Sequence, residues 1–180
     1  MFRRFSAGLA ILSASFLAPT VASAQIEKGD SQISLQGSLS TNIGDTGGSS
    51  YTSGNVGGSY GYYFTRQLAL RGVAYITAAK ASGGSTDITG IYGGGIELNL
   101  TGANQPFVPY IAFDALTSSS ASGTQGSVML GPTVGARAFV SRNTAFNVAM
   151  QYQTYSDNTQ VGTLQTSFGF SVFFGGDRRR

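Results

Sequence analysis

The feature that most constrains this chain is a repeated alternation of apolar residues with small or polar ones, which recurs in eight segments. In the last segment, Phe168, Phe170 and Phe174 would lie on one side of an extended strand, and Gly169 and Ser171 on the other. Successive side chains of a strand point to opposite faces, so the alternation predicts strands that each have one apolar face. The eight predicted strands span residues 31–41, 51–64, 66–79, 86–100, 106–117, 126–140, 144–155 and 162–174.

The connections between the predicted strands alternate in length. Short connections are expected at 65–66, 101–105 and 141–143, and mostly longer ones, rich in Ser and Gly, at 42–50, 80–85, 118–125 and 156–161. Short turns at one end and longer loops at the other are typical of a membrane-spanning β-barrel. An even number of strands also places both chain ends on the same side of such a barrel.

The first 24 residues, MFRRFSAGLAILSASFLAPTVASA, have the pattern of a secretory signal peptide. Arg3 and Arg4 precede an apolar run over about 7–17, and an A-x-A pattern predicts cleavage between Ala24 and Gln25. The alternative is an uncleaved membrane anchor, but the apolar run is too short to span a bilayer as a helix. The predicted domain organisation is a cleaved signal peptide (1–24), a barrel (25–174) and a short polar and basic tail (175–180).

The composition indicates that much of the outer surface is not in water. Charged residues make up 11% of the chain, against about 25% in a typical soluble domain. The chain has no cysteine and no histidine, which excludes a thiolate metal site and a disulfide framework and removes the commonest general base. The one basic run is Arg178–Arg180, so no nucleic-acid partner is expected.

Four charged residues lie inside the predicted strands: Arg71, Glu97, Asp114 and Arg137. Each is on the face opposite to the apolar residues of its own strand, and the two positive charges can neutralise the two negative ones. A charge at the lipid midplane costs about 2–4 kcal/mol for Arg, so a membrane barrel must keep these residues inside. We therefore predict a charge network in the lumen, with Arg71 and Glu97 close together although about three residues out of direct register. A ligand or proton site is the alternative interpretation of the same four residues.

The remaining residues of the two faces agree with this orientation. Gly, Ser, Thr, Asn and Gln dominate the face that carries the charges, and an eight-stranded barrel has an interior just wide enough for side chains to fill. Aromatic residues of the apolar face gather near the turn-side ends of the strands, as in an interfacial band. The members of this predicted aromatic band are Tyr62, Phe64, Phe107, Phe146 and Phe174.

With these features the mature chain resembles the small eight-stranded outer-membrane β-barrel proteins of Gram-negative bacteria, the OmpA/OmpX-like group. The last strand ends on Ser167-x-Gly169-x-x-Val172-x-Phe174, which is similar to the pattern that such proteins present to the barrel assembly machinery. The resemblance implies that these four residues form an assembly signal. Members of the group often end on the aromatic residue itself, whereas here GGDRRR follows.

The sequence thus predicts an all-β fold, an eight-stranded antiparallel up-and-down transmembrane β-barrel in the bacterial outer membrane. We expect a monomer with a filled lumen, a structural or surface-interaction role, no catalytic activity, no cofactor and no metal. The expected partners are outer-membrane lipid and, during biogenesis, the barrel assembly machinery. The Gly- and Ser-rich loops carry no aromatic or charged patch that would identify a partner on the loop side.

Two other classes of function remain open at this stage. A soluble periplasmic or secreted lipocalin-like barrel could bind a small hydrophobic ligand, which would require the apolar residues of 168–174 to point inward and Arg71 and Arg137 to point outward. An enzyme could use Asp114 with Glu97 as an acid pair. Both carboxylates would then be inside the barrel, out of reach of a large substrate.

Overall fold

The computed structural model describes residues 26–43, 52–80, 86–101, 105–120, 128–156 and 162–175. The predicted signal peptide with its cleavage site at Ala24 and Gln25, the tail beyond Gly175, and most of the four longer connections lie outside the described residues.

Eight strands account for most of the described chain, and they coincide with the eight predicted segments to within three residues at each end. The strands are β1 (Asp30–Ile43), β2 (Thr52–Tyr63), β3 (Leu68–Lys80), β4 (Thr86–Asn99), β5 (Phe107–Ser120), β6 (Met129–Phe139), β7 (Thr144–Tyr155) and β8 (Gly162–Gly175). No helix in the described residues is long and apolar enough to cross a membrane.

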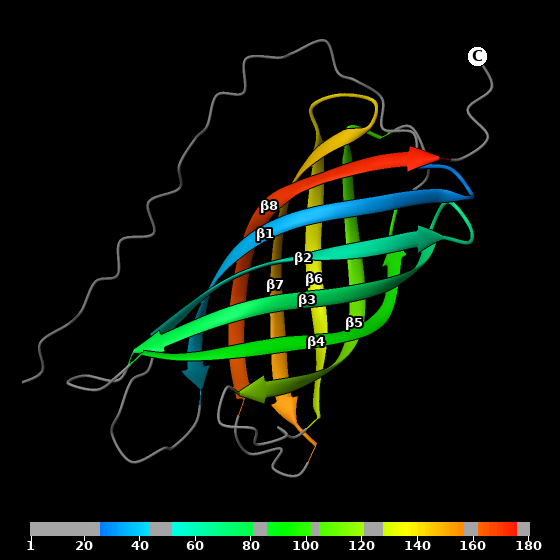
Figure 1. The fold of residues 1–180 in the computed structure, drawn as a ribbon. Helices are drawn as coiled ribbons and strands as arrows, with labels where there is room; N and C mark the ends of the chain where they lie inside the picture. Colours follow the sequence, from blue (N-terminus) through cyan, green and yellow to red (C-terminus); the bar gives the residue numbers. More distant parts are fainter. Residues whose placement is uncertain are drawn as a thin grey trace, which may run out of the picture.

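The strands form a closed barrel in which each strand pairs with the next in the sequence and β8 pairs with β1 (Figure 1). All eight pairings are antiparallel, and at the seam Ile33 pairs with Val172 and Asp30 with Gly175. The first residue of β1 and the last of β8 therefore lie side by side at the end of the barrel that carries the short connections, here called the turn side. Closure leaves no strand edge without a partner, and it confirms the predicted fold class.

The outer wall of the barrel is apolar, as the alternation predicts. Leu35, Val56, Ile76 and Val134 are between 63% and 70% exposed although they are large aliphatic residues. A water-soluble domain of this size does not present so continuous an apolar surface. The wall is thus suited to hydrocarbon rather than to water.

The predicted aromatic band is present on this wall. Tyr62, Phe64, Phe107, Phe146 and Phe174 all point outward near the turn side and are between 36% and 56% exposed. The rings of Tyr62 and Phe64 pack edge to face, with their centroids 5.2 Å apart. Amphipathic and aromatic rings at one rim of an apolar wall are typical of a membrane–water interface.

The lumen is filled by side chains, and inward-facing glycines make the space for them. A Cβ atom on Gly135 would lie 2.5 Å from Cζ of Tyr110 on the neighbouring strand, and one on Gly57 would lie 2.6 Å from Cδ1 of Tyr75. Large inward rings on one strand therefore require a glycine directly opposite on the next. The alternation in the sequence predicts small inward residues, but it does not reveal how many aromatic rings they accommodate.

Candidate functional site

The charged residues of the lumen form the candidate site, and they lie between two apolar layers. Towards the turn side is a layer that we call the apolar cap, which consists of Ile26, Tyr63, Ala69, Val108, Phe139, Ala145 and Phe173. Towards the loop side lies a second cluster, which consists of Val73, Tyr75, Leu116 and Met129. The charged network between them consists of Arg71, Glu97, Asp114 and Arg137.

Glu97 is at the centre of the charged network. Its Oε2 atom lies 2.6 Å from Nη2 of Arg137 and 3.4 Å from Nη1 of Arg71. Its Oε1 atom accepts a hydrogen bond of 2.7 Å from the hydroxyl of Tyr63. Glu97 is 3% exposed, so both of its oxygens are satisfied within the lumen.

Arg71 joins the two carboxylates of the network. Besides its contact with Glu97, it places Nη2 2.9 Å from Oδ2 of Asp114. The same carboxylate oxygen accepts hydrogen bonds from Gln151 Nε2 at 2.8 Å and from Thr133 Oγ1 at 3.4 Å. Asp114 is fully buried, and a buried carboxylate needs this many donors to offset its lost hydration.

Arg137 is the most enclosed cation of the network, at 1% exposure. Its Nη1 atom donates a hydrogen bond of 2.9 Å to Oδ1 of Asn99. Its guanidinium group lies 4.1 Å from the centre of the Tyr110 ring, a cation–π arrangement that favours a desolvated arginine. The glycine opposite Tyr110, Gly135, is what allows the ring to lie there.

The barrel brings together all four charged residues that the sequence singled out. They come from β3, β4, β5 and β6, four consecutive strands, and so they share one wall of the lumen. Ala69 pairs with Glu97 and Arg71 with Gly95, so the ion pair is two residues out of register rather than the expected three. The difference arises because Lys80 pairs with Thr86, whereas the sequence predicts that Lys80 belongs to the connection.

Several partners of the network were not identified from the sequence. Tyr63, Asn99 and Tyr110 each contact a charged residue of the network. Each of them alternates with the outward-facing apolar residues of its own strand, so the sequence predicts that all three point into the lumen. The identity of the partner depends on the stagger between strands, which the alternation does not contain.

The network has its charges balanced internally. Each carboxylate faces at least one guanidinium group, and Glu97 and Asp114 are bridged by Arg71 rather than placed as a pair sharing a proton. In the described parts of the chain, no group of three or more Asp, Glu, His or Cys side chains is arranged to hold a metal ion. Chemically, the arrangement is suited to holding the lumen together.

The four residues of the proposed assembly signal all lie on β8. Val172 and Phe174 point outward, at 43% exposure each, whereas Gly169 is buried on the inward side. Ser167 is half-buried, and its hydroxyl donates a long hydrogen bond of 3.5 Å to the carbonyl of Ala149. Their role in assembly stays a prediction.

The fold is similar to that of several solved structures. No protein-family model and no curated protein sequence matches the chain. Among solved structures, Neisserial surface protein A is similar at TM-score 0.61 and 16% identity, over 82% of this chain and 100% of that one. OprG, an outer-membrane protein of Pseudomonas aeruginosa, is similar at TM-score 0.58 and 14% identity, over 84% of this chain and 99% of that one.

A third similar structure is Ail, the attachment invasion locus protein of Yersinia pestis. It matches at TM-score 0.55 and 17% identity, over 82% of this chain and 99% of that one. At identities this low the similarity concerns the fold. The chain has the eight-stranded fold of the small bacterial outer-membrane barrels, which confirms the resemblance seen in the sequence.

Proposed function

We propose that this chain, whose fold is that of the small outer-membrane barrels, is an integral protein of the outer membrane of a Gram-negative bacterium. Its role is structural or one of surface interaction, its lumen is filled, and it has no catalytic activity. The protein acts as a monomer in contact with outer-membrane lipid.

The observation that carries the proposal is the direction of the two faces. Arg137, Glu97 and Asp114 are at most 3% exposed, while Leu35 and Val56 are each 70% exposed. A lipocalin-like soluble barrel needs the reverse arrangement, with apolar residues inside and charges outside. In such a soluble barrel Phe168 and Phe170 would line the cavity, yet here they are 49% and 57% exposed.

The absence of catalysis is proposed from the residues of the lumen. The chain contains no histidine and no cysteine, so a Ser-His or Cys-His nucleophile cannot be assembled. The two buried carboxylates are engaged by arginines, and the apolar cap lies between them and the turn side. The lumen therefore offers a substrate neither a His-activated nucleophile nor a carboxyl group that is free of an arginine.

We also propose that β8 carries the signal for the barrel assembly machinery. The strand is the last to be made, and it pairs with both β7 and β1, so its placement closes the barrel. Phe174 stands at the turn-side rim, and Gly175 follows with a φ of +89°, a left-handed conformation that suits glycine. Gly175, which pairs with Asp30, is the last residue of β8.

Cell fractionation combined with electrophoresis tests the proposed location. The protein should be found in the outer-membrane fraction and should migrate differently in detergent gels before and after boiling, because the closed barrel resists unfolding by the detergent. Recovery in the soluble periplasmic fraction, with no shift on boiling, would refute the proposal.

A further inference from the structure

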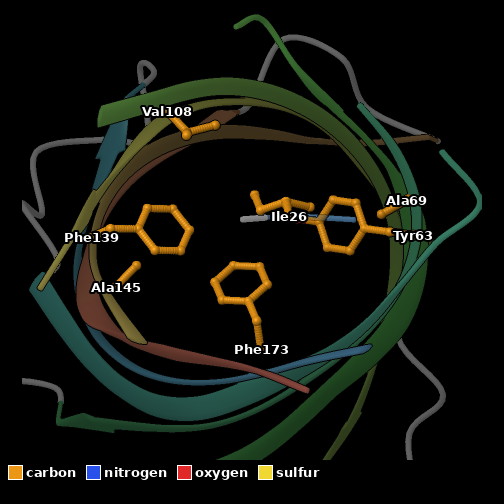
Figure 2. Packing of buried hydrophobic residues seen from close by; sticks show 7 residues of the cluster. All are labelled: Ile26, Tyr63, Ala69, Val108, Phe139, Ala145 and Phe173. Atoms are coloured by element: carbon orange, nitrogen blue, oxygen red, sulfur yellow. The ribbon is translucent and has the colours of Figure 1, made fainter. Parts of the chain in front are cut away.

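The segment that precedes β1 folds back into the turn-side mouth of the barrel. Ile26 is only 3% exposed, although it belongs to no strand. The other six residues of the apolar cap come from β2, β3, β5, β6, β7 and β8 and point into the lumen around it (Figure 2). Ile26 thus fills the centre of a ring of side chains that six strands provide.

The fold-back is held by a defined turn. The Glu27 amide donates a hydrogen bond of 2.8 Å to Oδ2 of Asp30, and the Asp30 amide donates one of 3.1 Å to the Glu27 carbonyl. The Gly29 amide donates to the Tyr63 carbonyl at 2.8 Å, which attaches the turn to the end of β2. Gly29 has a φ of +87°, so the chain reverses at a residue that adopts this conformation without steric cost.

Tyr63 connects this segment to the charged network. Its backbone carbonyl holds Gly29, its ring is part of the apolar cap, and its hydroxyl donates to Glu97. Phe173 packs against the rings of Tyr63 and Phe139, with centroids 6.1 Å and 5.2 Å away. Behind these rings lie Glu97 and Arg137, which the cap separates from the water on the turn side.

We propose that residues 26–29 form a plug that closes the turn-side mouth of the lumen and can open it by turning outward about Gly29. Among the described residues, the plug is attached by the side chain of Ile26 and by the hydrogen bonds of the turn at 27–30, whereas the other residues of the cap belong to the strands of the barrel. Segments with few contacts open at much lower free energy than the strands that carry them. When the plug is out, water and small ions reach the residues of the apolar cap.

Cysteine labelling tests the plug, because the chain contains no cysteine and an introduced thiol is the sole reactive one. Ala145→Cys places the thiol in the cap, at a position with no solvent exposure. The probe is a small cationic methanethiosulfonate reagent applied to the whole folded chain in detergent. Ile26→Gly in this background should speed the labelling about ten- to a hundredfold, which corresponds to about 1.4–2.8 kcal/mol.

Two controls distinguish the plug from a general loosening of the barrel. Lys28→Ala removes an exposed side chain of the same segment and should leave the labelling rate of Ala145→Cys unchanged. Ala149→Cys, a buried position deeper on β7, should be labelled slowly with or without Ile26→Gly. Equal acceleration at Ala145→Cys and Ala149→Cys, or no acceleration at Ala145→Cys, would overturn the proposal.

A second variant covers the case in which Ile26→Gly does not fold, as judged by the shift on boiling. Gly29→Val opposes the left-handed turn and leaves Ile26 intact, and it should also speed labelling of Ala145→Cys. If neither variant folds, the segment is an obligatory part of the barrel and the idea of a movable plug is wrong.

Discussion

Arg137 on β6 and Glu97 on β4 form a direct ion pair, with 2.6 Å between Nη2 and Oε2. These strands are not neighbours, since β5 lies between them. The pair therefore ties together strands that share no backbone hydrogen bonds. Because the pair is buried in the middle layer of the lumen, each charge compensates the lost hydration of the other.

Removing one charge from this layer should destabilise the barrel strongly. Arg137→Ala removes the shorter of the two ion pairs of buried Glu97 and leaves it only Arg71, at 3.4 Å, and breaking a buried pair costs about 3–5 kcal/mol. Arg142→Ala, which truncates an exposed arginine of the β6–β7 turn, is the matched control and should have little effect. The free energy of unfolding, measured by denaturant titration in detergent, checks both. Similar stabilities of the two variants would mean that the lumen pair contributes nothing.

The depth dependence of charge on the outer wall should identify the surrounding medium. Val134 and Val140 are almost equally exposed, at 63% and 60%, but Val134 is in the middle of β6 and Val140 follows its end. Arginine should cost about 2–4 kcal/mol at the bilayer midplane and about 0–1 near the interface.

Unfolding in lipid bilayers should therefore show Val134→Arg to be clearly less stable than Val140→Arg. If the wall were in contact with water, both substitutions would be tolerated alike, because both side chains point away from the barrel.

The inward glycines should be far less tolerant than the outward ones. Gly135→Ala brings a Cβ within 2.5 Å of Tyr110 Cζ, whereas a Cβ on the outward Gly72 has no neighbour closer than 4.0 Å. Overpacking of this kind costs about 1–3 kcal/mol, and Gly72→Ala should stay within about 0.5 kcal/mol of the parent.

A double-mutant cycle with Tyr110→Leu checks the cause of this effect. Gly135→Ala should cost less once the aromatic ring is absent, since the clash is with its far edge. An unchanged cost in the Tyr110→Leu background would place the clash elsewhere.

The direction of each side chain could be predicted from the sequence, because parity along a strand is a local property. The alternation predicts that Arg71 and Glu97 point into the barrel, and in the structure both do so. Their exact partners could not be predicted, since Tyr63 and Asn99 reach the network through the stagger of strands distant in sequence. The alternation predicts nothing about Ile26, because that residue is in no strand and its burial depends on the turn at Gly29.

The space available for aromatic rings inside the barrel could not be predicted from the sequence either. Phe139 and Phe173 have inward parity, but a ring fits inside an eight-stranded barrel only where neighbouring strands present small residues. Their burial at 7% and 0% depends on the whole circumference of the apolar cap. A single strand therefore predicts which way a ring points, and the closed barrel decides whether there is room for it.

The aromatic residue near the end of β8 is expected to matter for assembly in the cell. Phe174→Ala should reduce insertion into the outer membrane in cells, while refolding of the purified chain into detergent should change little, because the assembly machinery acts only in the cell. Phe168→Ala is the matched control: it truncates an outward phenylalanine of similar exposure on the same strand, 49% against 43%, but away from the terminal position. Deleting residues 176–180 should leave insertion intact, since β8 ends at Gly175 and its pairing with β1 does not include these residues. The measurement is the amount of each variant in the outer-membrane fraction of the cells. Equal insertion of Phe174→Ala and Phe168→Ala would show that the terminal aromatic carries no special information, and β8 would then be an ordinary closing strand.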